Sequence, residues 1–225
     1  MNILVVSGGD HPYQETTPLL LDFLGEAGHK VTMTEDSSEL TSPTLETYDV
    51  IIFNTRREGA LTLSRDEQLY LSLFVGKGGG LIVVHIAGAL PEGWPQWHDL
   101  TGGGWVPGRS YHPEYGQYTV KISDREHPCV NGISDFVTND ELYMDIAQQP
   151  DIDIFLTSEF KGQLYPLGWT RSYCDGRVMY TSLGHDGLSF KTPEFQKLIL
   201  NGIEWTTEEH EMLHDPLASL RADKI

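Results

Sequence analysis

Imidazole side chains follow several of the most apolar segments of this 225-residue chain. His11, His85 and His185 each come after a short aliphatic segment and lie near glycine. Such segments predict strands that are buried in a parallel sheet. Because ligands bind beyond the carboxyl ends of parallel strands, we expect the three histidines to share one crevice. Imidazoles placed there can carry acid–base chemistry or bind a metal ion.

His85 is the most informative of these residues, because it directly follows the apolar segment 81–84 and precedes the small residues Ala87 and Gly88. A buried strand that ends at a reactive residue and then turns is similar to a nucleophile elbow. Histidine cannot supply a thiolate or an alkoxide there, but it can act as a general base, a metal ligand or a hydrogen-bond donor to substrate. The structural alternative is a histidine that is hydrogen-bonded within a turn.

A divalent metal such as zinc is a second use for these side chains, because mixed imidazole and carboxylate sites suit it. The candidate ligands are the imidazoles of His11, His85, His112 and His185 and the carboxylates of Asp10, Glu141 and Asp186. Since these residues are spread along the chain, a metal site requires them to converge in space. Metal binding and metal-free acid–base chemistry both remain open.

Other polar and aromatic residues are predicted to shape the same crevice. Aromatic faces stack on sugars, although large aromatic side chains are also ordinary components of a core. The predicted substrate-binding residues are His11, Arg56, Trp97, His112, Tyr143 and Trp169. The predicted catalytic residues are His85, His185 and Glu141, although the tetrapeptide 140–143 that contains Glu141 would equally suit the start of a surface helix.

Composition and charge exclude several classes of partner. The chain has 15 Lys and Arg against 33 Asp and Glu, and this net charge of -18 argues against nucleic acid and anionic membranes. No apolar segment reaches the ~20 residues of a bilayer span, and the N-terminus has no signal-peptide pattern. Cys129 and Cys174 are too few for a disulfide framework, and their contexts predict bystanders rather than nucleophiles. We therefore expect a soluble cytoplasmic protein whose partner is a small molecule.

The predicted elements explain how distant residues could meet. Predicted strands over 3–7, 30–35, 48–53 and 81–84 alternate with helical patterns and Gly-rich turns; in 30–35, Val31 and Met33 alternate with threonines. This alternation predicts an α/β fold with a doubly wound parallel sheet. Thr17-Pro18 has the pattern of a cap followed by proline at the first helical position, which places the start of the first helix there.

Between about residues 89 and 165 the alternation fails, and pieces such as 117–122 suggest antiparallel strands. No linker separates this region, so it is predicted to be an irregular antiparallel insertion on the same sheet. A final helix over 193–205 would complete a single domain of residues 1–205. The polar, acidic tail 206–225 could wrap the body or contact another subunit, so a homo-oligomer remains open.

In this order and spacing, the motifs resemble those of the ThuA-like, or trehalose-utilisation, family of the class I glutamine amidotransferase-like superfamily. The resemblance covers Ile3 to about Trp205, nearly the whole chain. The motifs that carry it include Ser7-Gly8-Gly9-Asp10-His11-Pro12, Gly78-Gly79-Gly80-Leu81-Ile82-Val83-Val84-His85, Leu100-Thr101-Gly102-Gly103, Asp140-Glu141-Leu142-Tyr143 and Leu183-Gly184-His185-Asp186.

The resemblance implies a flavodoxin-like, amidotransferase-type sheet, with His85 where the superfamily's catalytic cysteine stands and His185 near its triad histidine. A cysteine-dependent glutaminase is therefore not expected, and a glutamine amidotransferase with another nucleophile is a remote third reading. The family implies the catabolism of trehalose or keto-disaccharides, and hence an enzyme that acts on a small-molecule sugar. The alternative is a non-catalytic carbohydrate-binding or regulatory module on the same fold.

Overall fold

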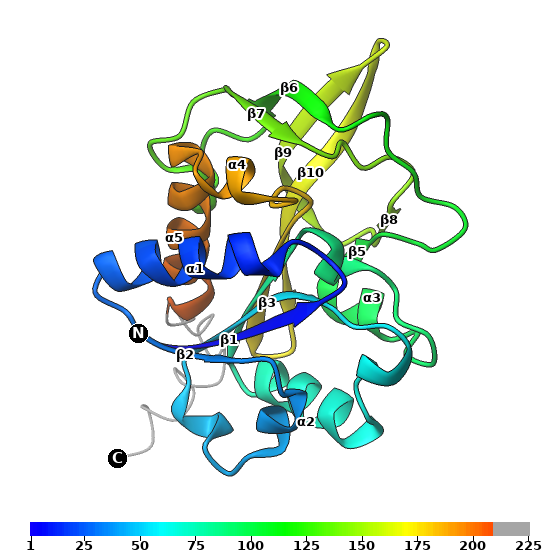
Figure 1. Ribbon diagram of the computed structural model, residues 1–225. Coiled ribbons are helices and arrows are strands. Elements are labelled where there is room, and N and C mark those ends of the chain that lie inside the picture. The colour runs from blue at the N-terminus through cyan, green and yellow to red at the C-terminus, as the bar shows by residue number, and fades with distance from the viewer. Residues whose placement is uncertain (209–225) are drawn as a thin grey trace, which may run out of the picture.

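A nine-stranded sheet runs through the computed structural model, which describes residues 1–208. Most of the predicted tail, 206–225, therefore lies outside the described residues. The strand order is β2-β1-β3-β4-β11-β10-β9-β6-β7, so the sheet contains elements from both ends of the described chain (Figure 1).

The first half of the sheet is parallel. Its strands are β2 (Lys30–Thr34), β1 (Asn2–Gly9), β3 (Val50–Arg56), β4 (Gly80–Val84) and β11 (Gly176–Thr181). This succession is the strand order of a flavodoxin-like fold. The predicted doubly wound α/β sheet is confirmed.

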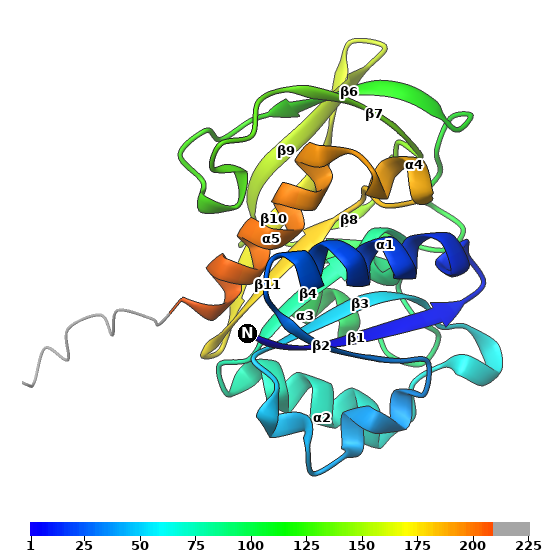
Figure 2. The same ribbon diagram turned by 60° about the vertical axis from the view of Figure 1, so that its left-hand side comes forward.

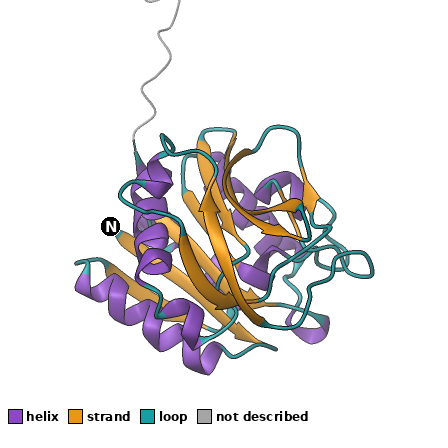
Figure 3. Ribbon diagram, turned by 90° about the horizontal axis from the view of Figure 1, so that it is seen from above, coloured by secondary structure: helices purple, strands orange, loops and turns teal. Residues whose placement is uncertain are grey.

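Helices cover both faces of the parallel strands (Figures 2 and 3). One face packs against α1 (Tyr13–Glu26) and α5 (Pro193–Thr207), and the other against α2 (Arg65–Gly76) and α3 (Trp97–Thr101). Successive side chains of a strand point to opposite faces, so Ile3 and Val5 belong to one core while Leu4 and Val6 belong to the other. This double burial explains why the strand has no polar alternation in the sequence.

The second half of the sheet is antiparallel. Its strands are β10 (Gln163–Tyr173), β9 (Asp153–Phe160), β6 (Gly116–Ile122) and β7 (Phe136–Asp140). The expected antiparallel insertion is thus part of the same sheet. Four successive reversals from β11 leave β7 running in the direction of β11, so the carboxyl ends of both strands face the same edge.

Short elements complete the described chain. They are α4 (Gly187–Phe190), the two-stranded pair β5 (Gly103–Gly104) and β8 (Ala147–Gln148), and the 3-10 segments η1 (Ser37–Thr41), η2 (Leu45–Thr47), η3 (Gly59–Leu61), η4 (His85–Gly88) and η5 (Pro128–Val130). Cys174 lies in the turn between β10 and β11 with a φ of 54°, as the hairpin prediction requires. Among residues 1–208, no helix has the length and apolar character that crossing a membrane demands.

The start of the first helix differs from the prediction. Helix α1 begins at Tyr13, and Pro18 lies inside it. The turn that initiates the helix is formed by Pro12, whose carbonyl accepts from the N–H groups of Glu15 and Thr16. The hydroxyl of Thr17 is instead hydrogen-bonded to that of Ser7 on β1, at 2.5 Å. Thr17 thus fastens the helix to the sheet and does not cap it.

Candidate functional site

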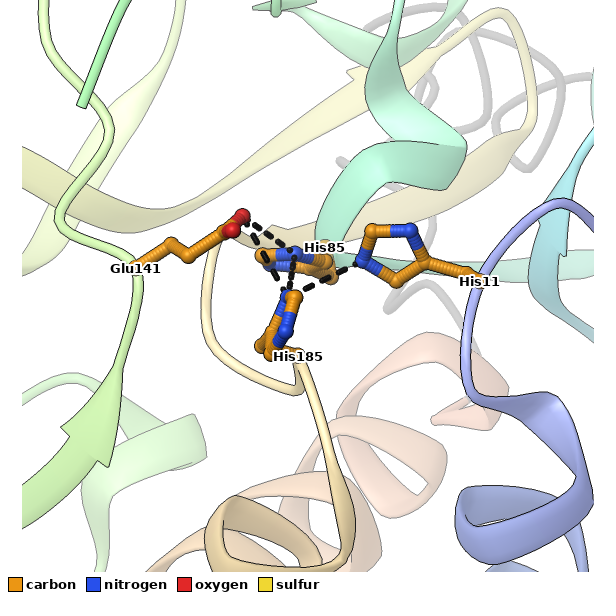
Figure 4. A group of neighbouring side chains, drawn as sticks. All are labelled: His11, His85, Glu141 and His185. Carbon is orange, nitrogen blue, oxygen red and sulfur yellow. Dashed lines mark hydrogen bonds and ion pairs between the residues drawn. The ribbon is translucent and has the colours of Figure 1, made fainter. Parts of the chain in front are cut away.

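Four side chains from four separate segments converge at the carboxyl edge of the sheet (Figure 4). His11 lies in the loop after β1, His85 opens η4 directly after β4, Glu141 directly follows β7, and His185 lies in the loop after β11. One ligand atom from each residue lies within 4.8 Å of the others. Among residues 1–208 this is a group with the donors and spacing that a metal ion requires.

The backbone at His85 has a φ of 54°, in the left-handed region that residues other than glycine rarely adopt. This is the sharp strand-to-helix turn that the sequence pattern indicates at this position. Nδ1 of His85 donates to the carbonyl of Ser182 at 2.6 Å. Because a carbonyl can only accept, Nδ1 carries the proton of the neutral ring and Nε2 carries the lone pair.

Tyr143 approaches that lone pair from inside the protein. Its ring stacks on His85 with a centroid separation of 4.6 Å, and its hydroxyl donates to Nε2 of His85 at 2.7 Å. Burial raises the pKa of Tyr143 well above its ordinary value of 10.0, so the phenol keeps the proton that it donates.

The tautomer of His11 is fixed in the same way. Its Nδ1 donates to the carbonyl of Asp10 at 3.1 Å, which leaves the lone pair on Nε2, the atom that faces the cluster. Burial lowers the pKa of His11 to about 4, with repulsion from His85 and His185 acting in the same direction. His11 therefore enters the cluster as a neutral ring at pH 7.

His185 lies at the centre of these acceptors. Its Nδ1 is 3.1 Å from Nε2 of His11, 3.3 Å from Oε2 of Glu141 and 3.4 Å from Nε2 of His85. The hydrogen bond with Glu141 raises the pKa of His185 above its ordinary value of 6.5, against the effect of burial. Two nitrogen lone pairs and a carboxylate therefore surround one position that attracts positive charge.

The carboxylate of Glu141 is held in its ionised form. Burial opposes ionisation, but the nearby imidazoles of His185 and His85 together hold the pKa of Glu141 below its ordinary value of 4.5. Its Oε2 is 3.3 Å from Nε2 of His85, and its Oε1 is 3.5 Å from Nε2 of His112. Three imidazole nitrogens and one carboxylate oxygen form a donor set that suits zinc and related divalent ions.

The neighbouring acid, Asp140, points into the protein. It is 1% exposed, and both of its oxygens accept hydrogen bonds, from the N–H groups of Glu141, Gly184 and His185 and from the hydroxyl of Ser189. Burial raises the pKa of Asp140, and the nearby imidazole of His85 and these hydrogen-bond donors act in the opposite direction. The sequence pairs two acids at 140 and 141, but it does not indicate which of them faces the crevice.

The rim of the site is partly exposed. The side chain of His112 is 35% exposed, and its Nδ1 donates to the carbonyl of Pro113 at 2.7 Å. Trp105 packs between the rings of His112 and Tyr143, at centroid separations of 5.9 and 4.6 Å. Tyr115 lies 5.3 Å from the ring of His185 and donates its hydroxyl to Asp186 at 2.7 Å. Trp105 and Tyr115 were not among the predicted site residues, because aromatic residues in an irregular segment carry no positional signal.

The structure places the other predicted ligands and binding residues away from the cluster. Asp10 is exposed, and Asp186 caps α4 through the N–H groups of Leu188 and Ser189. Arg56 forms an ion pair of 3.0 Å with Glu58 at the end of β3, beside a small cavity of about 40 Å³. Glu141 is therefore the oxygen donor that reaches the imidazoles.

Two further predicted substrate-binding aromatics are core residues, as is Tyr143 with an exposed fraction of 1%. Trp97 is 1% exposed and donates its indole N–H to the carbonyl of Ala87, while Trp169 is fully buried and donates to the carbonyl of Thr101. A side chain without exposed surface cannot stack on a substrate. The expected sugar contact is therefore replaced at both positions by packing against the sheet.

A further metal-binding spacing is present in the sequence. Residues 210–214 read His-Glu-Met-Leu-His, which fits the HExxH pattern of a helical zinc site. This segment lies outside the described residues. Any measurement of bound metal must therefore separate its contribution from that of the cluster.

Comparison with known proteins gives one family and several similar folds. The family model for ThuA, described as trehalose utilisation, matches residues 2–206. Structures described as ThuA-like come from Parabacteroides merdae (22% identity, TM-score 0.80, 92% of this chain and 90% of that one) and Bacteroides uniformis (21%, 0.72, 92% and 91%). The cytoplasmic protein STM3548 from Salmonella typhimurium is also similar (17%, 0.61, 92% and 99%). No curated protein matches the sequence.

Proposed function

This chain belongs to the ThuA family, and on that premise we propose that it is an enzyme that acts on a sugar or keto-sugar by metal-assisted acid–base chemistry. The site is the cluster of His11, His85, Glu141 and His185. The observation that carries the proposal is the orientation of the lone pairs. Those of His11 and His85 are directed inward because Asp10 and Ser182 occupy the opposite nitrogens.

A divalent cation such as zinc fits this donor set. In the structure the acceptors crowd around Nδ1 of His185, where positive charge is needed to relieve their mutual repulsion. When bound, such a cation would supply a Lewis acid that polarises a carbonyl or hydroxyl oxygen of the sugar. The four side chains would hold it. Because Nε2 of His85 has one lone pair, the hydroxyl of Tyr143 would give up its hydrogen bond to that atom, and the stacked ring of Tyr143 would keep the ring of His85 in place.

Proton transfer is assigned to the rim. His112 is the most exposed imidazole beside the cluster. Its proton on Nδ1 is fixed by Pro113, so Nε2, which lies 3.5 Å from Oε1 of Glu141, carries the lone pair that can accept a proton from a bound sugar. Abstraction of a proton next to the carbonyl of a keto-sugar is the reaction type that this pairing suits. A neutral sugar also suits a rim whose nearest charged groups are carboxylates. The description of the Salmonella relative supports a cytoplasmic location as part of the proposal.

The test is metal analysis followed by product analysis. Purified protein is stripped with a chelator, reloaded with zinc or cobalt, and incubated with trehalose and with oxidised disaccharides while products are followed by mass spectrometry and NMR. We expect one tightly bound ion per chain and conversion of a sugar that stops in His85→Ala. The double variant His210→Ala/His214→Ala is the matched control, and it should keep both metal and activity.

Three outcomes would contradict the proposal in different ways. Sugar binding without conversion would favour the carbohydrate-binding module. Loss of the metal in the His210→Ala/His214→Ala control would show that residues 210–214, and not the cluster, bind it. Release of ammonia from glutamine would restore an amidotransferase reading.

A further inference from the structure

Asp140 is not itself a candidate ligand, but its carboxylate is hydrogen-bonded to the backbone of two of them, Glu141 and His185. Its Oδ1 accepts from the N–H of Glu141 at 2.8 Å and from the N–H of His185 at 3.3 Å. Its Oδ2 accepts from the N–H of Gly184 at 2.7 Å and from the hydroxyl of Ser189 at 2.6 Å. We propose that Asp140 is the positioning residue of the site, and that its buried carboxylate sets the separation between Glu141 and His185.

The geometry excludes a direct role as a metal ligand. Each carboxylate oxygen offers two lone pairs, and each oxygen of Asp140 already accepts two hydrogen bonds. The residue is only 1% exposed. Asp140 must therefore act through the groups that it holds.

The connection is needed because of the sheet order. Strands β10, β9 and β6 lie between β7 and β11, so no backbone pairing joins the segment of Glu141 to that of His185. The sheet curls enough for the end of β7 to reach the loop after β11, and the carboxylate of Asp140 bridges the two. Gly184, with a φ of 113°, turns two consecutive N–H groups toward the same carboxylate. Such an arrangement of backbone amides is suited to hold an anion.

The same carboxylate also acts on a third ligand. Oδ1 of Asp140 lies 4.0 Å from Nδ1 of His85. A negative charge at that distance favours the tautomer with its proton on Nδ1, which is the one that places the lone pair on Nε2, the atom that faces the cluster. One buried acid therefore influences the position or the tautomer of His85, Glu141 and His185.

The inference rests on the proposed cation site, so the test has one readout with metal and one without. Asp140→Asn keeps the shape but replaces an acceptor oxygen with an NH2 group that faces N–H donors. We expect cobalt affinity, measured in the His210→Ala/His214→Ala background by competition with a chelator, to fall by about 10- to 100-fold although all four ligands remain. The visible absorption spectrum of bound cobalt should also change, because it reports the geometry of the ligands. In metal-free protein, the amide protons of Gly184 and His185 should exchange with solvent at least about tenfold faster.

Controls keep the readouts distinct. Ser189→Ala removes only the hydroxyl donor and leaves the three backbone donors, so it should keep the cobalt spectrum and the amide protection. Should Asp140→Asn fail to fold, Asp140→Glu is the second variant. It retains the charge but shifts both oxygens, and it should weaken cobalt binding.

The outcomes separate this inference from the proposed function. Wild-type cobalt affinity and spectrum in Asp140→Asn, or in Asp140→Glu where the amide variant does not fold, would overturn the positioning role. A wild-type protein that binds no cobalt would overturn the cation site, and the positioning role would then be decided by amide exchange alone. If the amide protons of Gly184 and His185 exchange with solvent at the wild-type rate in metal-free Asp140→Asn, Asp140 does not position these residues.

Discussion

Nε2 of His11 lies 3.1 Å from Nδ1 of His185, although 174 positions separate the two residues in the chain. Their strands, β1 and β11, are parallel members of one sheet with β3 and β4 between them. The approach is possible because the loops that follow both strands turn toward the strand exit of β4, where His85 lies. The parallel half of the fold thus brings the three imidazoles together, and the antiparallel half adds the acid.

Glu141→Gln should weaken cation binding more than any change outside the cluster. The amide has no negative charge to offset that of the cation and leaves three imidazoles as ligands. Since loss of a residue behind the ligands already costs 10- to 100-fold, we expect affinity for zinc to fall by more than about 100-fold. Calorimetric titration of stripped protein measures this, with the exposed Glu114→Gln as the matched control. Equal affinity in both variants would remove Glu141 from the ligand set.

Trp169→Ala should lower stability without a direct effect on sugar recognition. The residue is fully buried and its ring packs at a tilt against that of Tyr180, with a centroid separation of 4.2 Å, so truncation should cost about 3–5 kcal/mol in the free energy of unfolding. Trp169→Phe should cost about 1–3 kcal/mol, because it leaves the carbonyl of Thr101 without its donor. Urea unfolding measures both, and Tyr70→Ala, at a position 47% exposed, should cost about 0.5 kcal/mol or less. A variant of Trp169 with wild-type stability and a raised KM would instead restore the residue as a sugar contact.

Gly9→Ala should be far more damaging than Gly108→Ala. At Gly9, with a φ of 103°, an added Cβ would lie 1.9 Å from the carbonyl oxygen of Arg56. The clash and the backbone strain together should cost at least about 3 kcal/mol and displace the nearby His11. Gly108 has a φ of 76° and nothing close to an added Cβ, so Gly108→Ala should lose only the stability that the backbone strain costs, about 1–2 kcal/mol. Similar thermal midpoints for the two variants would contradict this account.

His127 should make the protein less stable in mild acid. Its Nδ1 accepts from the N–H of Cys129 at 3.1 Å, so protonation of that nitrogen would break the bond. Burial lowers the pKa of His127 from its ordinary value of 6.5. The unfolded chain therefore takes up the proton first as the pH falls, and stability that is present above about pH 6.5 is lost below it.

The variant His127→Asn isolates this contribution, because asparagine can also accept at the start of η5 but does not titrate. The urea midpoint should fall less between pH 7.5 and pH 5.5 in the variant than in the wild type. An equal loss in both proteins would assign the acid sensitivity to other buried histidines, such as His98.

The sequence predicted β1, β3 and β4 well because these strands are buried on both faces and contain continuous aliphatic segments, while the edge strand β2 was indicated by the alternation of Val31 and Met33 with threonines. It could not predict that the sheet curls to bring Asp140 beside Gly184, since that contact depends on three intervening strands. The sequence also could not show that Trp97 and Trp169 are buried, because an indole ring can either pack in a core or stack on a sugar. The wrong start of α1 has a local cause: Thr17 has the residue type of a cap, but its hydroxyl is used by Ser7.

The dispersal of the cluster over positions 11 to 185 has a consequence for synthesis of the protein. A nascent chain on the ribosome exposes His11 and His85 long before Glu141 and His185 have been made. Two imidazoles on an unfinished sheet bind an ion weakly and without a defined geometry. The four-ligand cation site that is proposed above can therefore form only after position 185 has been synthesised and has left the ribosome.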